Sequence, residues 1–189
     1  MSTAVIPSPH GPLLSAEQFA ERPDPGYPEE LIRGEVVPMP MPKPRHGHVC
    51  NKAGRILGNF VEEHRLGWVF SNDTGVITQR GPDTVRGADV AFYRYDRLPA
   101  GELPDHYPDA APDLVIEVVS PSDRWPKVLA KVAEYLEAGV TVVVVLDGEP
   151  PSAQVYRPDR PAAVLGPDDE LTLPDLLPGF SVGVRRFFE

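Results

Sequence analysis

The segment Asp113-Leu-Val-Ile-Glu-Val-Val-Ser120 is an almost unbroken apolar run with one acid, Glu117, near its middle. Runs of this kind are typical of a strand that is buried on both faces of a sheet. An ionised carboxylate in such a strand costs several kcal/mol unless it is paired or binds a metal. We therefore expect Glu117 to have a partner, either a buried Arg or Lys or a cation.

The residues after this run complete a βαβ pattern. Beyond Ser120-Pro-Ser-Asp123, helical spacing predicts a helix to about Ala138, with Gly139 as its C′ residue. The apolar side chains expected to be buried on this helix are Val128, Val132, Tyr135 and Leu136. A second apolar strand is predicted over residues 140–146. Strand, helix and strand in succession favour a mixed sheet whose core strands are covered by helices.

Upstream of the run, the pattern predicts a hairpin and a long helix. Glu30-Leu31-Ile32 and Glu35-Val36-Val37 flank Arg33-Gly34, where Gly accepts the positive φ of a tight turn. From His46 to about Arg65, apolar residues recur at steps of three and four, the spacing of an amphipathic helix. Short strands are expected at 68–70, 75–79 and 88–93, separated by Asn-Asp and Gly-Pro-Asp turns.

The ends of the chain differ in character. Residues 1–13 are expected to be a disordered, Pro-rich tail, and residues 14–189 a single domain. Ser15 is a predicted N-cap of a short helix that ends before Pro23, with Gln18 completing a capping box. Residues 153–156, 162–165 and 180–188 are expected to form short antiparallel strands.

Composition narrows the classes of function. The net charge of -10 disfavours a non-specific nucleic-acid binder, because phosphate affinity comes largely from Lys and Arg. It is compatible with a metal-dependent nuclease, since clustered carboxylates require a cation before an anionic substrate approaches. The single cysteine, Cys50, favours a reducing cytoplasm, and the longest apolar run is too short to span a membrane.

Three further residues join Glu117 as candidates for a site. Asp89 opens a predicted strand and could point into a cleft, although an acid there more often serves a turn. Lys131 borders the buried stripe of its helix, whereas Lys127 is expected on the outer surface. Glu30, with Glu35 as its substitute, offers a third acid, although most hairpin acids face water.

The remaining motifs are less informative. His46 begins the long helix, where it could approach an anion at the positive end of the helix dipole. Neither His46 nor His48 has a partner at a spacing such as His-Glu-X-X-His, which disfavours a zinc site built on them. Motifs of dinucleotide, NTP, serine-hydrolase and zinc-ribbon sites are absent from the sequence.

Taken together, these segments resemble the Uma2-like (DUF820) family over residues 15–188. The resemblance rests on segments that occur in a shared order: Glu30-Leu-Ile-Arg-Gly-Glu35, Pro44-Arg-His46, Ala88-Asp-Val-Ala-Phe92, Pro112 to Asp123, Lys131-Val-Ala-Glu-Tyr135 and Ala138-Gly-Val140. That family is placed in the PD-(D/E)XK nuclease superfamily. The resemblance implies an α/β (α+β) fold like that of restriction endonucleases, with a mixed central sheet flanked by helices and extra antiparallel hairpins.

The family pattern also implies roles for individual residues. Asp89 corresponds to the first acid and Glu117 to the second, and together they would hold Mg²⁺, with Mn²⁺ as a possible substitute. The superfamily lysine two positions after the second acid is absent, because position 119 is Val. The pattern places the lysine on the following helix, which makes Lys131 the candidate, with Glu30 as an extra catalytic acid.

Three functions are compatible with this sequence. The first is a Mg²⁺-dependent endonuclease that hydrolyses phosphodiester bonds of DNA. The second is a catalytically inactive nuclease-fold protein that acts as a binding or regulatory module. The third is a homo-oligomer, such as a dimer, that packs through residues 180–188, although core packing explains the phenylalanines there equally well.

Overall fold

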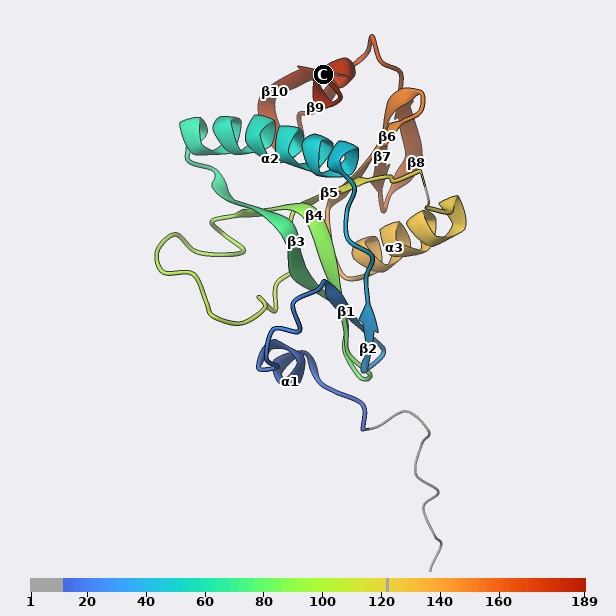
Figure 1. Cartoon of the computed structure of the whole chain (residues 1–189). Helices are drawn as coiled ribbons and strands as arrows, with labels where there is room; N and C mark the ends of the chain where they lie inside the picture. The colour runs from blue at the N-terminus through green and yellow to red at the C-terminus, as the bar shows by residue number, and fades with distance from the viewer. Residues whose placement is uncertain (1–11, 122) are drawn as a thin grey trace, which may run out of the picture.

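The apolar run forms β5 (Leu114–Val118), a central strand of an eight-stranded mixed sheet. In the computed structural model, which describes residues 12–121 and 123–189, the strand order is β2-β1-β4-β5-β6-β7-β8, and β3 pairs with β4. Two long helices, α2 (Pro44–His64) and α3 (Trp125–Glu137), lie on opposite faces of the sheet (Figure 1). This arrangement confirms the predicted mixed sheet flanked by helices.

The βαβ unit is present as predicted. β5 pairs in parallel with β6 (Val142–Gly148), and α3 connects the two strands. Gly139 follows the C-cap of α3 with a φ of 98°, a left-handed conformation that suits glycine. Of the side chains of α3 that were expected to be buried, Val132 and Tyr135 are fully buried, and Val128 and Leu136 are partly buried.

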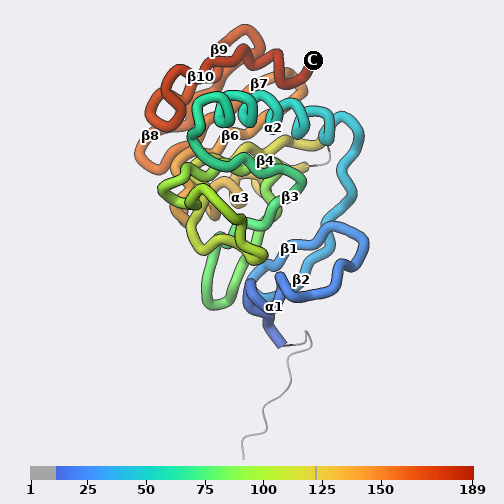
Figure 2. The backbone as a smooth tube through the Cα atoms, turned by 90° about the vertical axis from the view of Figure 1, so that its left-hand side faces the viewer, coloured from blue at the N-terminus to red at the C-terminus, as the bar shows by residue number. Residues whose placement is uncertain are grey.

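The N-terminal hairpin also follows the prediction. β1 (Glu29–Ile32) pairs with β2 (Glu35–Pro38), and Arg33 and Gly34 form the turn with φ values of 51° and 80°. The preceding helix α1 (Ala16–Ala20) begins with the expected capping box between Ser15 and Gln18. In Figure 2, α1 and this hairpin form one end of the molecule, and β9 and β10 lie at the other.

The strand prediction between residues 67 and 94 was wrong in one respect. Residues 68–70 and 75–79 belong to one strand, β3 (Gly67–Gln79), which pairs along most of its length with β4 (Thr84–Arg94). Asn72 and Asp73 form a bulge within β3, with φ values of 68° and 56°, rather than a turn between two strands. Asn and Asp tolerate this left-handed conformation, so one dipeptide is compatible with either structure.

The C-terminal part consists of antiparallel strands and a short 3₁₀ helix. β7 (Pro151–Arg157) and β8 (Arg160–Leu165) extend the main sheet, whereas β9 (Glu170–Leu173) and β10 (Leu177–Gly183) form a separate pair followed by η1 (Val184–Phe187). Phe180 and Phe187 are buried in the core of this chain. Phe188 is partly buried against the same core. Core packing thus accounts for these phenylalanines, and packing of this segment against a neighbouring molecule stays a prediction.

The sheet separates two apolar layers. On one face, Val49, Ala53, Leu57 and Val61 of α2 pack with side chains of the sheet and of β9, β10 and η1. On the other face, Val132 and Tyr135 of α3 pack with alternate residues of β4, β5 and β6. β4 and β5 are thus covered on both sides, which explains the continuous apolar sequence of β5.

Two sequence predictions concern the outline of the chain. Residues 1–11 of the predicted disordered tail lie outside the described residues, and the assignment of residues 14–189 to a single domain stays a prediction. Within the part that the structure describes, none of the helices combines the length and the apolar character needed to cross a bilayer.

The close approach of β3 to β4 leads to a testable expectation at Gly67. A Cβ at this position would lie 1.9 Å from the carbonyl oxygen of Tyr93, so Gly67→Ala forces the backbones apart. We expect the variant to lose about 1–3 kcal/mol of unfolding free energy in urea denaturation. Gly58→Ala, at an open position of α2, is the control and should be neutral or slightly stabilising. Equal effects of the two substitutions would contradict the steric argument.

Candidate metal centre

The site lies where β4 and β5 separate. Their antiparallel pairing extends through Val90 and Ile116, and the next β5 amide on that side is Val118. Its N–H donates to the Asp89 carboxylate oxygen Oδ2 at 2.7 Å instead of to a backbone carbonyl of β4. Asp89 is therefore within β4, not at its start as predicted, and its side chain fills the gap between the strands while remaining 6% exposed.

The bulge of β3 is opposite Asp89. The pairing of β3 and β4 passes from Ser71–Val90 to Thr74–Ala88, so Asn72 and Asp73 together face the single residue Asp89. β-Bulges of this kind often occur beside functional sites, where they redirect a side chain. Here the bulge brings a second carboxylate, that of Asp73, close enough to Asp89 for the charge of Asp89 to raise the pKa of Asp73, which is also raised by desolvation.

Glu117 points from β5 toward α3. Its Oε2 accepts a hydrogen bond from Lys131 Nζ at 2.8 Å, and its Oε1 accepts one from the Tyr135 hydroxyl at 2.9 Å. The side chain of Glu117 is 12% exposed. Glu117 is thus paired with a lysine, which is one of the two kinds of partner expected from the sequence, a basic side chain or a cation. This lysine is Lys131, the predicted site residue. Each oxygen keeps a further lone pair with which it can bind a cation.

Glu30 contacts the same lysine from the other side. Its Oε1 lies 3.6 Å from Lys131 Nζ and accepts the Gly87 N–H at 3.1 Å, while its Oε2 accepts from Arg86 at 2.8 Å. Lys131 also donates to the Gly87 carbonyl oxygen at 2.8 Å. Glu30 is buried, unlike the usual hairpin acid, whereas its alternative Glu35 is exposed on β2.

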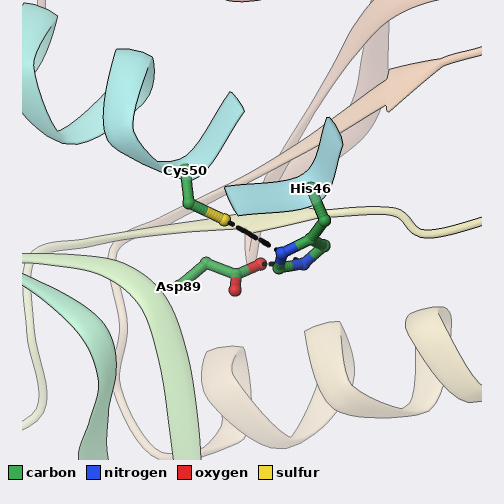
Figure 3. Close-up of side chains that lie close together, drawn as sticks. All are labelled: His46, Cys50 and Asp89. Atoms are coloured by element: carbon green, nitrogen blue, oxygen red, sulfur yellow. Dashed lines mark hydrogen bonds and ion pairs between the residues drawn. The ribbon is translucent and has the colours of Figure 1, made fainter. Parts of the chain in front are cut away.

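Two side chains of α2 approach Asp89 from the opposite face of the sheet. His46 Nε2 lies 3.4 Å from Asp89 Oδ2, and the Cys50 sulfur lies 3.3 Å from His46 Nδ1 (Figure 3). The three side chains come together because His46 and Cys50 are one turn apart on α2, directly above β4. The site therefore has an all-oxygen acidic part beside α3 and a mixed nitrogen and sulfur part beside α2.

The carboxylates repel one another and shift their pKa values. Burial raises the pKa of Glu117 to about 7; Lys131 opposes this shift and the charge of Asp89 adds to it. Desolvation and the charge of Asp89 likewise raise the pKa of Asp73. Burial alone would raise the pKa of Asp89, but the hydrogen bond and charge of His46, together with Lys131, hold it below its usual value.

The basic groups respond in the opposite sense. The hydrogen bond with Asp89 raises the pKa of His46, in spite of partial burial. Burial would lower the pKa of Lys131, but the charges of Glu117 and Glu30 raise it well above its usual value. Lys131 is thus cationic at neutral pH and lies against the acids of the cluster.

These residues fit a hard divalent cation. Carboxylate oxygens are the protein ligands that Mg²⁺ and Mn²⁺ prefer, and Asp89 and Glu117 supply them from neighbouring strands. Burial is the main cause of the raised pKa of Glu117 and the charge of Asp89 adds to it, so a cation between the two acids would favour the ionised form of Glu117. The donor set and its electrostatics therefore match the metal expected from the sequence.

A cleft of about 250 Å³ opens next to these residues. His46 and Val118 line its inner end, and Lys43, Arg45 and Trp125 line other parts of it. Lys43 is the N-cap of α2, and Pro44 and Arg45 open the helix, so backbone N–H groups and two basic side chains gather at this end. Asp123, Asp147 and Glu149 line the cleft as well, and Glu149 forms an ion pair with Arg45, so the cleft carries charges of both signs and Lys43 is its basic side chain without that pairing.

The structure brings together all four residues predicted for the site, Asp89, Glu117, Lys131 and Glu30, and Lys127 is exposed as expected. Sequence reasoning missed Asp73, which was assigned to a turn, and Tyr135, which was counted only as core. It also missed Cys50 as a neighbour of His46. The spacing His46-X-X-X-Cys50 was visible in the sequence, and one helical turn places such residues on the same face.

Comparison with known families places this geometry in context. The model of the Uma2 family, described as "Putative restriction endonuclease", matches residues 16–185. The chain belongs to the Uma2 family. A search of functionally curated proteins gave no match.

The fold of this chain is shared with a solved structure. A crystal structure described as that of a putative nuclease belonging to DUF820, from Anabaena variabilis, superposes with a TM-score of 0.79 and 22% sequence identity. The alignment covers 93% of this chain and 97% of that chain. At this identity the similarity establishes the shared fold, and the roles of the site residues rest on the geometry described above.

Proposed function

We propose that this Uma2 protein is a Mg²⁺-dependent endonuclease that hydrolyses phosphodiester bonds of DNA. The observation that supports the proposal most directly is the meeting of Asp89, Glu117 and Lys131 at the end of the β4–β5 pairing, beside an open cleft. Two acids and a lysine at one sheet edge provide what phosphodiester hydrolysis requires: ligands for a cation and a fixed positive charge for the transition state.

Each residue has a role that follows from its contacts. Asp89 and Glu117 would hold Mg²⁺, or Mn²⁺ in its place, which supplies Lewis acidity toward a phosphate oxygen and toward water. Lys131 would orient the attacking water or stabilise the negative charge that develops on the phosphate. Glu30 and the Gly87 carbonyl hold the ammonium of Lys131 in position.

The acidic character of the chain is compatible with DNA binding only if the cleft attracts the DNA backbone locally. A net charge of -10 opposes DNA binding over most of the surface, so the backbone must be attracted locally. Lys43 and the N-terminus of α2 line the cleft and are suited to a phosphate next to the one that reacts. The proposal includes a homodimer, because two active sites are needed to cut both strands together. It also includes a cytoplasmic setting, which the single cysteine favours.

The test is a nicking assay on supercoiled plasmid, combined with calorimetric titration of Mg²⁺ and Mn²⁺. We expect the wild type to bind metal and to nick the plasmid, and a chelator to abolish nicking. Glu117→Gln, which keeps the size of the side chain but weakens its binding of cations, should lower the rate at least about 100-fold.

Different failures have different meanings. Metal binding without cleavage of any DNA tested would favour the binding or regulatory module with a nuclease fold. Nicking that is unchanged in Glu117→Gln would show that this acid serves only the buried pair with Lys131. Circular dichroism of the variant separates both outcomes from loss of the fold.

The raised pKa of Glu117 predicts that metal affinity depends on pH. With a pKa of about 7, Glu117 carries a proton in more acidic solution, and the metal must displace that proton. We expect Mn²⁺ affinity to rise with pH up to about 7 and then to level off. Lys131, Tyr135 and Asp89 also face Glu117, but their pKa shifts keep them in one protonation state across this range. His46, which contacts Asp89 and has a raised pKa, does change its charge near this range, so the titration is run in a His46→Asn background. Calorimetry in buffers of different ionisation enthalpy measures the released proton, and an affinity independent of pH would contradict Glu117 as a ligand.

A further inference from the structure

The second donor set of the site consists of His46, Cys50 and Asp89. One ligand atom of each side chain can be chosen so that all three lie within 4.8 Å of one another. Nε2 of His46 lies 3.4 Å from Asp89 Oδ2 and 3.9 Å from the Cys50 sulfur, which is nearer to Nδ1, at 3.3 Å. Figure 3 shows the imidazole beside both the thiol and the carboxylate, with a dashed line to each.

These separations are close to those of a tetrahedral metal site. Bonds of about 2.3 Å to sulfur and about 2.0 Å to nitrogen or oxygen place the ligand atoms about 3.3–3.6 Å apart. The two separations from Nε2 are within a few tenths of an ångström of that range, and side-chain rotation can supply the difference. A hydrogen bond from the Val118 N–H already fixes the orientation of the Asp89 carboxylate, as is usual for metal ligands.

The chemistry of the donors selects the ion. Imidazole and thiolate suit Zn²⁺ and neighbouring transition metals, whereas Mg²⁺ prefers oxygen alone. His46 and Asp89 have side-chain exposures of 16% and 7%, and His46 lines the cleft, so the ligands are largely shielded while the position beside them stays accessible. Three protein ligands with one open position are typical of zinc sites that exchange their fourth ligand.

We propose that His46, Cys50 and Asp89 form a Zn²⁺ site that inhibits the nuclease by occupying Asp89. The binding of Zn²⁺ follows from the three side chains alone, whereas the inhibition rests on the proposed function. Zn²⁺ at Oδ2 of Asp89, the oxygen that faces His46, would compete with Mg²⁺ for this acid, because two cations on one carboxylate share its single negative charge and repel each other. Zn²⁺ would therefore withdraw a ligand from Mg²⁺, and the thiol would release its proton to solvent on binding.

The binding test uses Co²⁺ as a spectroscopic substitute for Zn²⁺ on the full chain. We expect one equivalent of Co²⁺ to produce a thiolate-to-cobalt charge-transfer absorption, and Zn²⁺ to remove it by competition. Because Cys50 is the only cysteine, this absorption reports on its sulfur. Cys50→Ser should abolish the absorption and weaken Zn²⁺ binding at least about tenfold. His46→Asn should weaken Zn²⁺ binding by a similar factor. A wild type without the absorption, or Zn²⁺ binding unchanged in both variants, would overturn the proposal.

The inhibition test separates this inference from the proposed function. Glu117→Gln should keep the cobalt absorption, because Glu117 is not a ligand of this site. In the nicking assay with Mg²⁺, Zn²⁺ should inhibit the wild type and have at least about tenfold less effect on Cys50→Ser. If nicking is absent but the cobalt absorption appears, the Zn²⁺ site stands and the nuclease proposal fails. If nicking occurs and Zn²⁺ inhibits Cys50→Ser as strongly as the wild type, the inhibitory role fails.

Discussion

Replacement of Lys131 with methionine should lower the rate of plasmid nicking about 10²–10³-fold while the fold is retained. The ammonium of Lys131 is the group that can stabilise charge on the reacting phosphate, and methionine keeps most of the volume of the side chain. The loss of the cation also removes the charge that favours ionised Glu117. Rates should therefore be measured at saturating Mn²⁺, so that weaker metal binding is not mistaken for a slower reaction.

Lys127→Met is the matched control. Lys127 lies one turn earlier on α3 and is exposed, so its replacement removes the same charge from the chain without touching Glu117. We expect it to change the nicking rate by less than about threefold, through net charge alone. If Lys131→Met nicks plasmid as fast as Lys127→Met does, the lysine does not take part in the reaction and only balances the buried acid.

The parts of the fold that could be predicted are those with strong local signals. The unbroken apolar run of β5, the helical spacing of α3 and the Arg33-Gly34 turn each have one low-energy solution, and the structure confirms them. The same logic located the buried acid. A carboxylate at Glu117 needs a partner wherever the chain folds. The sequence left that partner open as an Arg, a Lys or a cation, and the structure identifies it as Lys131, which the family resemblance had made a site candidate.

The bulge could not be predicted from local signals. Asn72 and Asp73 tolerate a left-handed backbone in a turn and in a bulge alike, so only the pairing of β3 with β4 decides between the two. Asp89 shows the same limit. Its position opposite the bulge, at the end of the β4–β5 pairing, depends on three strands that are distant in sequence.

The α2 side of the site shows that the spacing of two ligands along a helix is not enough to predict a metal site. One helical turn separates His46 and Cys50, so both lie on one face of α2. Residues at this spacing usually belong to the hydrophobic core, as the neighbouring Val49 and Ala53 do. The third ligand is Asp89, and it became visible only when α2 was seen to cross β4. Metal-ligand spacing within one helix is therefore a weak signal until another element supplies the next donor.

Replacement of Arg86 with methionine should destabilise the chain by about 3–5 kcal/mol. Its guanidinium donates to Glu30 at 2.8 Å and to both carboxylate oxygens of Glu134, and Glu30 and Arg86 have side-chain exposures of 5% and 14%. Without Arg86, Glu30 would remain buried with only the more distant Lys131, 3.6 Å away, as a cationic partner. Urea denaturation of wild type and variant at neutral pH measures the difference.

A double variant decides what this loss means for the site. Adding Glu30→Gln to Arg86→Met removes the buried charge of Glu30. The unfolding free energy of the double variant should therefore exceed that of Arg86→Met by at least about 1 kcal/mol. Glu134→Gln is the control and should cost less than about 1 kcal/mol, because Glu134 is 34% exposed and Arg86 keeps its bond to Glu30. If the double variant is no more stable than Arg86→Met, Glu30 does not depend on the arginine for its charge. Its negative charge would then be balanced within the site itself, by Lys131 or by a cation, which is what an extra catalytic acid requires.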